Sequence, residues 1–128
     1  MLGAYQRRPV RRRGVRCTGW RFRRLVLQAC DGLPRRFQKL LHNVAVTVEE
    51  VPPRLVRLDG GALGLYEGTP IGLRGTDYTM ALPDKITVYR RPLLAACHTQ
   101  RELRDEVRLT VLHEIGHYFG IDDAELPF

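Results

Sequence analysis

Residues 99–123 read TQRELRDEVRLTVLHEIGHYFGIDD, and this stretch determines the architecture around it. Thr99 and Glu102 form the capping-box pattern that opens a helix, because their side chains can accept hydrogen bonds from N–H groups left unpaired at the first turn. Gly120 stands where many helices end in a left-handed residue. Between these two signals, apolar residues at helical spacing predict one long helix with a buried stripe, made of Leu103, Val107, Val111, Ile115 and Phe119.

The same predicted helix carries the pattern H-E-x-x-H at residues 113–117. His113 and His117 are four positions apart, so both imidazoles lie on one helix face and can reach a single metal ion. Glu114 is turned by roughly 100° from His113. Its carboxylate can therefore accept a proton from a metal-bound water without being a ligand. The pattern predicts a metal site with Glu114 as the catalytic base.

A catalytic zinc site needs a third protein ligand beside two imidazoles, with a fourth position left open. Gly120 lets the chain turn back toward the metal, because glycine accepts a positive φ at little cost. The pattern H-E-x-x-H-x-x-G-x-x-D places the donor at Asp123, six residues after His117, an offset known for the third ligand in longer zinc-site patterns. Asp122 could instead accept a hydrogen bond from a ligand imidazole without touching the metal. Glu125 is a further oxygen donor within reach of the metal. We predict one zinc ion on His113, His117 and Asp123, although similar ligand sets also hold iron and other divalent ions.

The rest of the chain predicts short elements around this helix. Helical spacing over residues 20–30, and a proline at the start of residues 34–41, predict two helices. Alternating valines at 44–48, a glycine-punctuated stretch at 62–68 and an apolar run at 86–89 predict strands, the second of them at a sheet edge. We therefore expect an α+β fold, in which a small mixed β-sheet packs against helices and the active-site helix lies toward the C-terminus.

Basic residues are concentrated at the start of the chain. Residues 1–24 contain nine arginines and no acidic residue, so the rest of the chain carries a net charge of −2 within a total of +7. We predict a disordered Arg-rich arm over residues 1–18 and a single domain over residues 19–128. The arm lacks the interleaved aromatic residues that stack on bases, which makes nucleic acid an unlikely partner, but its arginines leave such contact open.

The cysteines and the hydropathy pattern indicate a cytoplasmic protein without membrane contact. Cys17, Cys30 and Cys97 are odd in number, widely spaced and without a C-x-x-C pair, which argues against a disulfide scaffold and against a cysteine zinc site. No apolar run approaches the roughly 20 residues that span a bilayer. No apolar segment of a secretory signal follows the basic N-terminus.

With these motifs in place, the sequence resembles the minimal zincin-like metallopeptidases, which are small bacterial proteins. The resemblance covers roughly residues 20–126 and is strongest in TVLHEIGHYFGIDD at 110–123. Its other blocks are LP at 33–34, NVAV at 43–46, LGLYEG at 63–68, LPDKI at 82–86 and YRRPL at 89–93. The resemblance implies a small sheet with one active-site helix, zinc on His113, His117 and Asp123, and Glu114 as the catalytic glutamate.

The hypothesis from the sequence is hydrolysis of peptide bonds by a zinc-activated water, with Glu114 as general base. Extended peptides are expected to add a strand to the sheet along the edge at Leu63–Glu67. The alternative is a zinc-binding structural or regulatory protein without peptidase turnover, which needs the two histidines but not Glu114. By residue type alone, the candidates for stabilising the oxyanion are Tyr66, Tyr78, His98 and Tyr118.

Overall fold

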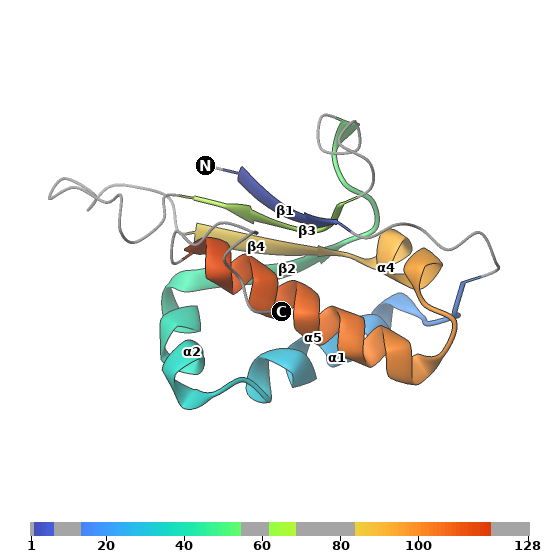
Figure 1. The fold of residues 1–128 in the computed structure, drawn as a ribbon, viewed down its shortest axis with the longest axis horizontal. Helices are drawn as coiled ribbons and strands as arrows, with labels where there is room; N and C mark the ends of the chain where they lie inside the picture. The colour runs from blue at the N-terminus through green and yellow to red at the C-terminus, as the bar shows by residue number, and fades with distance from the viewer. Residues whose placement is uncertain (1, 7–13, 55–61, 69–83, 119–128) are drawn as a thin grey trace, which may run out of the picture.

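The computed structural model describes residues 2–6, 14–54, 62–68 and 84–118 (Figure 1). The four strands form one sheet in the order β1-β3-β4-β2. β3 pairs antiparallel with both β1 and β4, whereas β2 and β4 run parallel. The expected α+β fold with a small mixed sheet is confirmed. In chain order the elements are β1 (Leu2–Gln6), α1 (Gly19–Asp31), α2 (Arg35–Leu40), the 3-10 turn η1 (Leu41–Asn43), β2 (Val44–Glu49), β3 (Ala62–Glu67), β4 (Asp84–Tyr89), α4 (Arg90–Ala96) and α5 (Gln100–Tyr118).

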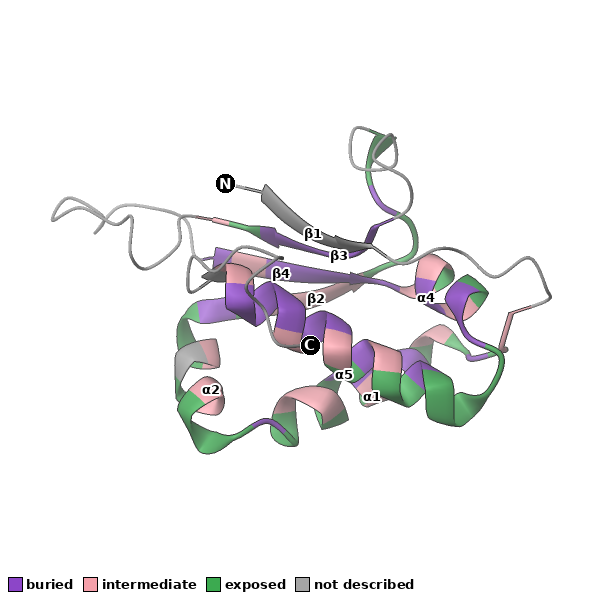
Figure 2. Ribbon diagram, in the orientation of Figure 1, coloured by how far each residue is buried: buried purple, intermediate pink, exposed green. Residues whose placement is uncertain are grey.

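Helix α5 lies against β1, β3 and β4 and packs beside α1 on the same face of the sheet (Figure 1). Figure 2 shows buried residues concentrated in β3, β4 and the sheet-facing side of α5. Burial of an aliphatic side chain contributes about 1.5–3 kcal/mol, so this contact fixes α5 on the sheet. The described part of the apolar stripe predicted for α5 is buried, and it forms one core cluster with Ile86 and Val88 of β4. The buried residues of the stripe are Leu103, Val107, Val111 and Ile115.

The start of α5 shows the predicted cap. The Thr99 hydroxyl accepts a hydrogen bond from the Glu102 N–H at 3.1 Å, and the Glu102 carboxylate accepts one from the His98 N–H at 2.9 Å. One unpaired donor of the first turn, the Glu102 N–H, is thus satisfied, and the carboxylate binds the N–H one residue before the one used in the usual capping box. The predicted stop at Gly120 lies outside the described residues.

Strand β1 departs from two predictions. Leu2–Gln6 belongs to the sheet, although the sequence predicts a disordered arm over residues 1–18. The arginines that drive that prediction stand mostly at positions 7–13, outside the described residues, and backbone pairing leaves no mark on composition. Because β1 covers one side of β3, the prediction that residues 62–68 form an edge strand is also wrong: β1 and β2 are the edges.

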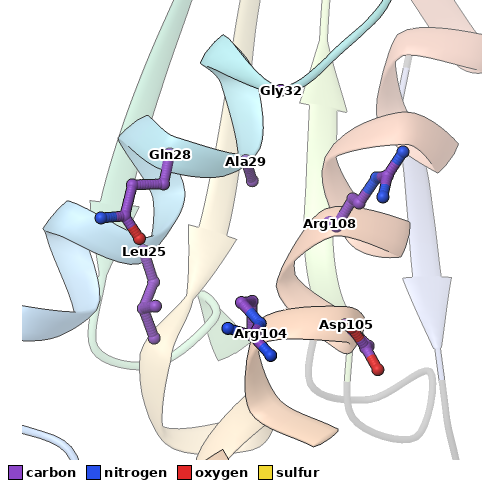
Figure 3. Close-up of a pocket in the computed structure, with 7 residues that line it drawn as sticks. All are labelled: Leu25, Gln28, Ala29, Gly32, Arg104, Asp105 and Arg108. Carbon is purple, nitrogen blue, oxygen red and sulfur yellow. The ribbon is translucent and has the colours of Figure 1, made fainter. Parts of the chain in front are cut away.

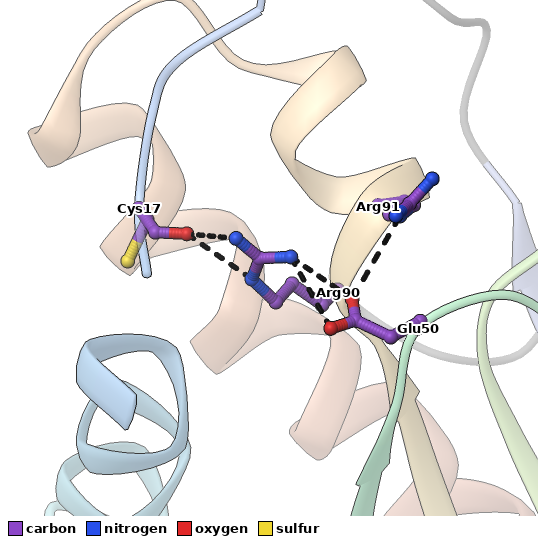
Figure 4. Close-up of polar contacts among 4 residues, drawn as sticks. All are labelled: Cys17, Glu50, Arg90 and Arg91. Carbon is purple, nitrogen blue, oxygen red and sulfur yellow. Dashed lines mark hydrogen bonds and ion pairs between the residues drawn. The ribbon is translucent and has the colours of Figure 1, made fainter. Parts of the chain in front are cut away.

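Residues 14–18 are also ordered, and Arg90 at the start of α4 fixes them. Its guanidinium Nε donates to the Cys17 carbonyl at 3.1 Å, and its Nη1 donates to the Glu50 carboxylate at 2.9 Å (Figure 4). The Arg90 side chain is 19% exposed, whereas neighbouring Arg91 is 70% exposed and reaches Glu50 only at 4.0 Å. One partly buried cation therefore joins the N-terminal segment, the residue after β2 and helix α4.

No disulfide joins Cys17, Cys30 and Cys97. Cys17 and Cys97 are buried in the core, and Cys30 is half-buried. Burial, followed by the negative charge of Asp31, raises the pKa of Cys30 to about 11, which keeps this thiol protonated at neutral pH. Within the described residues, no helix is long and apolar enough to cross a membrane.

Candidate active site

The H-E-x-x-H pattern occupies the last turns of α5. His113 is 6% exposed and His117 is half-buried, and their ring centroids lie 5.5 Å apart with the ring planes at 67°. Two imidazoles on one tetrahedral zinc, with Zn–N bonds of about 2.0–2.1 Å, have centroids about 5 Å apart. The spacing of the two rings therefore fits a shared ion. Their role as ligands stays a prediction.

Glu114 is completely buried, and it lies where α5 passes close to Gly64 of β3. A Cβ placed on Gly64 of β3 would meet the Glu114 Cγ at 3.4 Å, the Thr87 carbonyl at 3.2 Å and the Thr110 Cγ2 at 2.6 Å. The Thr110 hydroxyl donates to the Glu106 carbonyl at 2.7 Å. Only glycine leaves room for this approach, so Gly64 sets the height of Glu114 over the sheet.

Sequence reasoning took the glycine of β3 as the mark of an edge and missed this role. The available signal was a glycine inside a strand pattern, which also indicates close approach of another element. Gly64→Ala is expected to lower the free energy of unfolding by about 1–3 kcal/mol, because the added methyl group overpacks the contact with Thr110 and Thr87. Urea denaturation measures the change. Gly19→Ala is the control: its Cβ meets nothing within 4 Å, so no loss is expected.

A double-mutant cycle tests whether the loss comes from the contact with Thr110 or from any side chain at position 64. Thr110→Ser removes the Cγ2 methyl that crowds the position and keeps the hydroxyl bonded to Glu106. The double variant should lose less unfolding free energy than the sum of the losses in the two single variants. The difference, which is the coupling energy, should be about 0.5 kcal/mol or more. Strictly additive costs contradict the packing described here.

Tyr89, the last residue of β4, is buried and was not foreseen as part of the site's surroundings. Burial raises the pKa of its phenol to about 12, with smaller contributions from the negative charges of Glu49, Glu67 and Glu114. Tyr89 therefore remains a neutral phenol throughout the neutral range.

The third ligand cannot be placed, because Asp122, Asp123 and Glu125 lie outside the described residues. Within residues 2–6, 14–54, 62–68 and 84–118, no three His, Cys, Asp or Glu side chains gather as a metal-binding group. The prediction of Asp123 as a ligand therefore stays a prediction.

Two of the four oxyanion candidates can be located. Tyr66 is fully buried in the core, and a Cβ on Gly68 would lie 2.9 Å from its hydroxyl. His98 is exposed beyond the opposite end of α5, roughly 20 Å from His113 at 1.5 Å per helical residue, which excludes it from the site. Tyr78 and the side chain of Tyr118 lie outside the described part of the chain.

A hollow between α1 and α5 is separate from these residues (Figure 3). Its volume is about 200 Å³, below the range of roughly 300–1,000 Å³ that is usual for small-molecule sites. Arg108, the lining residue nearest the motif on α5, stands five residues before His113, about 7.5 Å along the helix, and none of His113, Glu114 and His117 lines the hollow. The hollow is therefore not the metal site. Its lining is Leu25, Gln28, Ala29, Gly32, Arg104, Asp105 and Arg108.

The mixed sheet and the helix that presents two histidines and a buried glutamate define a protein of the zincin class. The family model described as zincin-like metallopeptidase matches residues 41–127, which span β2 to α5 and the whole motif, and the chain belongs to this family. The solved structure of a conserved hypothetical protein from Thermus thermophilus is similar, with 28% sequence identity and a TM-score of 0.55. The likeness covers 80% of this chain and 94% of that chain. No curated protein matches.

Proposed function

We propose that this protein is a zinc-dependent peptidase in which His113, His117 and Asp123 hold the zinc ion. The observation that carries the proposal is the pair of imidazoles on α5, with ring centroids 5.5 Å apart and Glu114 in the same turn. Membership of the zincin-like metallopeptidase family supports the same reaction class.

A zinc ion held by these side chains supplies a Lewis acid that lowers the pKa of water and polarises a carbonyl oxygen. The work of this chain's own residues begins with Glu114, whose carboxylate accepts a proton from the attacking water as the new C–O bond forms. Glu114 then delivers that proton to the leaving nitrogen as the C–N bond breaks, which yields a carboxylic acid and an amine. The contact of α5 with Gly64 holds this carboxylate in place, so little entropy has to be lost to orient it for the reaction.

The second candidate function is a zinc-binding structural or regulatory protein without peptidase turnover. The observation that favours it is the burial of Glu114, whose side chain has no exposed surface. A general base has to come within hydrogen-bond reach of the water that it activates, whereas a structural zinc site requires no such access.

Metal content and peptide hydrolysis together test the two functions. Protein purified without added metal is expected to contain about one zinc ion per chain by mass spectrometry. It should hydrolyse members of a fluorogenic peptide library, lose that activity to a chelator and regain it with added zinc. Zinc without hydrolysis selects the structural or regulatory function, and a protein that takes up no zinc refutes both.

A further inference from the structure

The outer edge of β3 is filled by the chain itself. Leu2–Gln6 runs antiparallel to β3, with Leu2 opposite Glu67, Ala4 opposite Leu65 and Tyr5 opposite Gly64. An extended peptide that adds a strand to β3 forms the same main-chain hydrogen bonds in the same place. Peptide binding at this edge and the pairing of β1 are therefore mutually exclusive.

This edge is also the one beside the candidate catalytic residue. Gly64, the partner of Tyr5, is the residue of β3 whose Cβ position lies 3.4 Å from the Glu114 Cγ. Helix α5 contacts β1 as well as β3. The opposite edge of the sheet is β2, two strand spacings or roughly 10 Å from β3. A strand placed next to β3 thus lies nearer Glu114 than one added at β2.

The segment that precedes α1 is bound to the chain where α4 ends and α5 begins. The Val15 N–H donates to the Cys97 carbonyl at 2.9 Å, and the Gln100 side chain donates to the Arg16 carbonyl at 2.7 Å. Only seven residues, 7–13, separate β1 from this fixed segment. A short tether gives an effective concentration in the millimolar range, which favours β1 over peptides at micromolar concentration.

We infer that the outer edge of β3 is the peptide-pairing surface of this protein and that Leu2–Gln6 is its built-in competitor. The inference rests on the proposed peptidase function for its kinetic consequence, because a substrate has to displace β1 before it reaches Glu114. Competition of this kind raises the apparent KM and leaves kcat unchanged.

A variant that lacks residues 2–13 tests the inference against the full chain. It keeps the contacts of Val15 and Arg16, and a cooperative unfolding transition establishes that it folds. With a fluorogenic peptide substrate, kcat/KM should rise about tenfold or more through a lower KM, as expected when the open edge is a state of about 10% or less. The synthetic peptide Leu-Gly-Ala-Tyr-Gln, blocked at both ends, should inhibit the shortened protein competitively. Equal KM values for the two proteins overturn the inference.

A cross-strand disulfide provides a second test in the full chain. Leu2 and Glu67 are register partners, and the Cα separation of such pairs suits a disulfide, so Leu2→Cys with Glu67→Cys can lock β1 in place. The oxidised protein should hydrolyse peptides about tenfold more slowly than the same protein reduced with a phosphine. Leu2→Cys alone should not respond to the reductant. An oxidised protein as active as the reduced one overturns the inference.

Hydrogen exchange separates failure of this inference from failure of the peptidase function. In the variant without residues 2–13, the β3 amides that face β1 should exchange at least about tenfold faster than in the full chain, and the synthetic peptide should restore protection. This result supports the peptide-pairing edge even if neither protein hydrolyses any peptide, in which case the peptidase proposal alone fails. Unchanged exchange of β3 overturns the inference whatever the activity.

Discussion

Glu114→Gln is expected to lower kcat for peptide hydrolysis by about 10²–10⁴, the usual contribution of a general base, while the zinc content stays at that of the wild type. The amide has nearly the same shape as the carboxylate, so it can occupy the buried position next to Gly64. It cannot accept a proton from water, and the reaction loses its base. Peptide turnover and metal content measured on the same preparation give both quantities.

Glu106→Gln is the matched control for this change. Glu106 stands on the same helix two turns earlier, and the bond from Thr110 is to its backbone carbonyl, so the substitution leaves that bond in place. Its kcat should remain close to the wild-type value. If Glu114→Gln retains wild-type turnover, Glu114 is not the base and the proposed mechanism is wrong.

His117→Ala is expected to abolish stoichiometric zinc binding. Loss of a partner outside the ligand shell typically weakens metal binding by about 10–100-fold, and removal of a ligand itself should exceed that range. The imidazole lies on the exposed side of the pair, so its loss leaves a smaller cavity than a change in the core. Mass spectrometry after dialysis against a weak chelator measures the retained metal.

His98→Ala provides the comparison for the metal measurement. His98 is exposed and lies before the first turn of α5, at the opposite end of the helix from the motif. It should retain zinc as the wild type does. Zinc bound equally by His117→Ala and the wild type removes His117 from the ligand set and, with it, the geometric basis of the proposal. The two active-site substitutions thus differ in metal content, since one keeps the metal and loses turnover, whereas the other loses both.

The long helix and the α+β class could be predicted because periodic burial leaves its mark on every third or fourth residue. The apolar positions of α5, from Leu103 to Ile115, are core positions of the structure. The cap at Thr99 could be predicted for a similar reason, because a hydroxyl next to a free N–H acts locally.

Features that depend on contacts between distant segments could not be predicted in the same way. Strand β1 pairs through backbone groups that every residue carries, so its pairing leaves no pattern in the sequence. The arginines that follow it make the segment as a whole look disordered by composition. Gly64 was recognised as unusual, but whether a glycine marks an edge or a close approach depends on what packs above it. Asp123 was selected by the turn that Gly120 allows, by its offset from His117 and by the family resemblance, and its role as a ligand stays a prediction.

The order of the sheet has a consequence for how the chain is made. Leu2 is synthesised 65 residues before its partner Glu67, so β1 has to wait for β3. The two parallel strands β2 and β4 are likewise separated in sequence, and pairings between such distant segments form slowly. Helix α5 follows the four strands that the structure describes, so both histidines are synthesised after the sheet that supports them. The histidine pair therefore assembles on a scaffold whose strands have already been made.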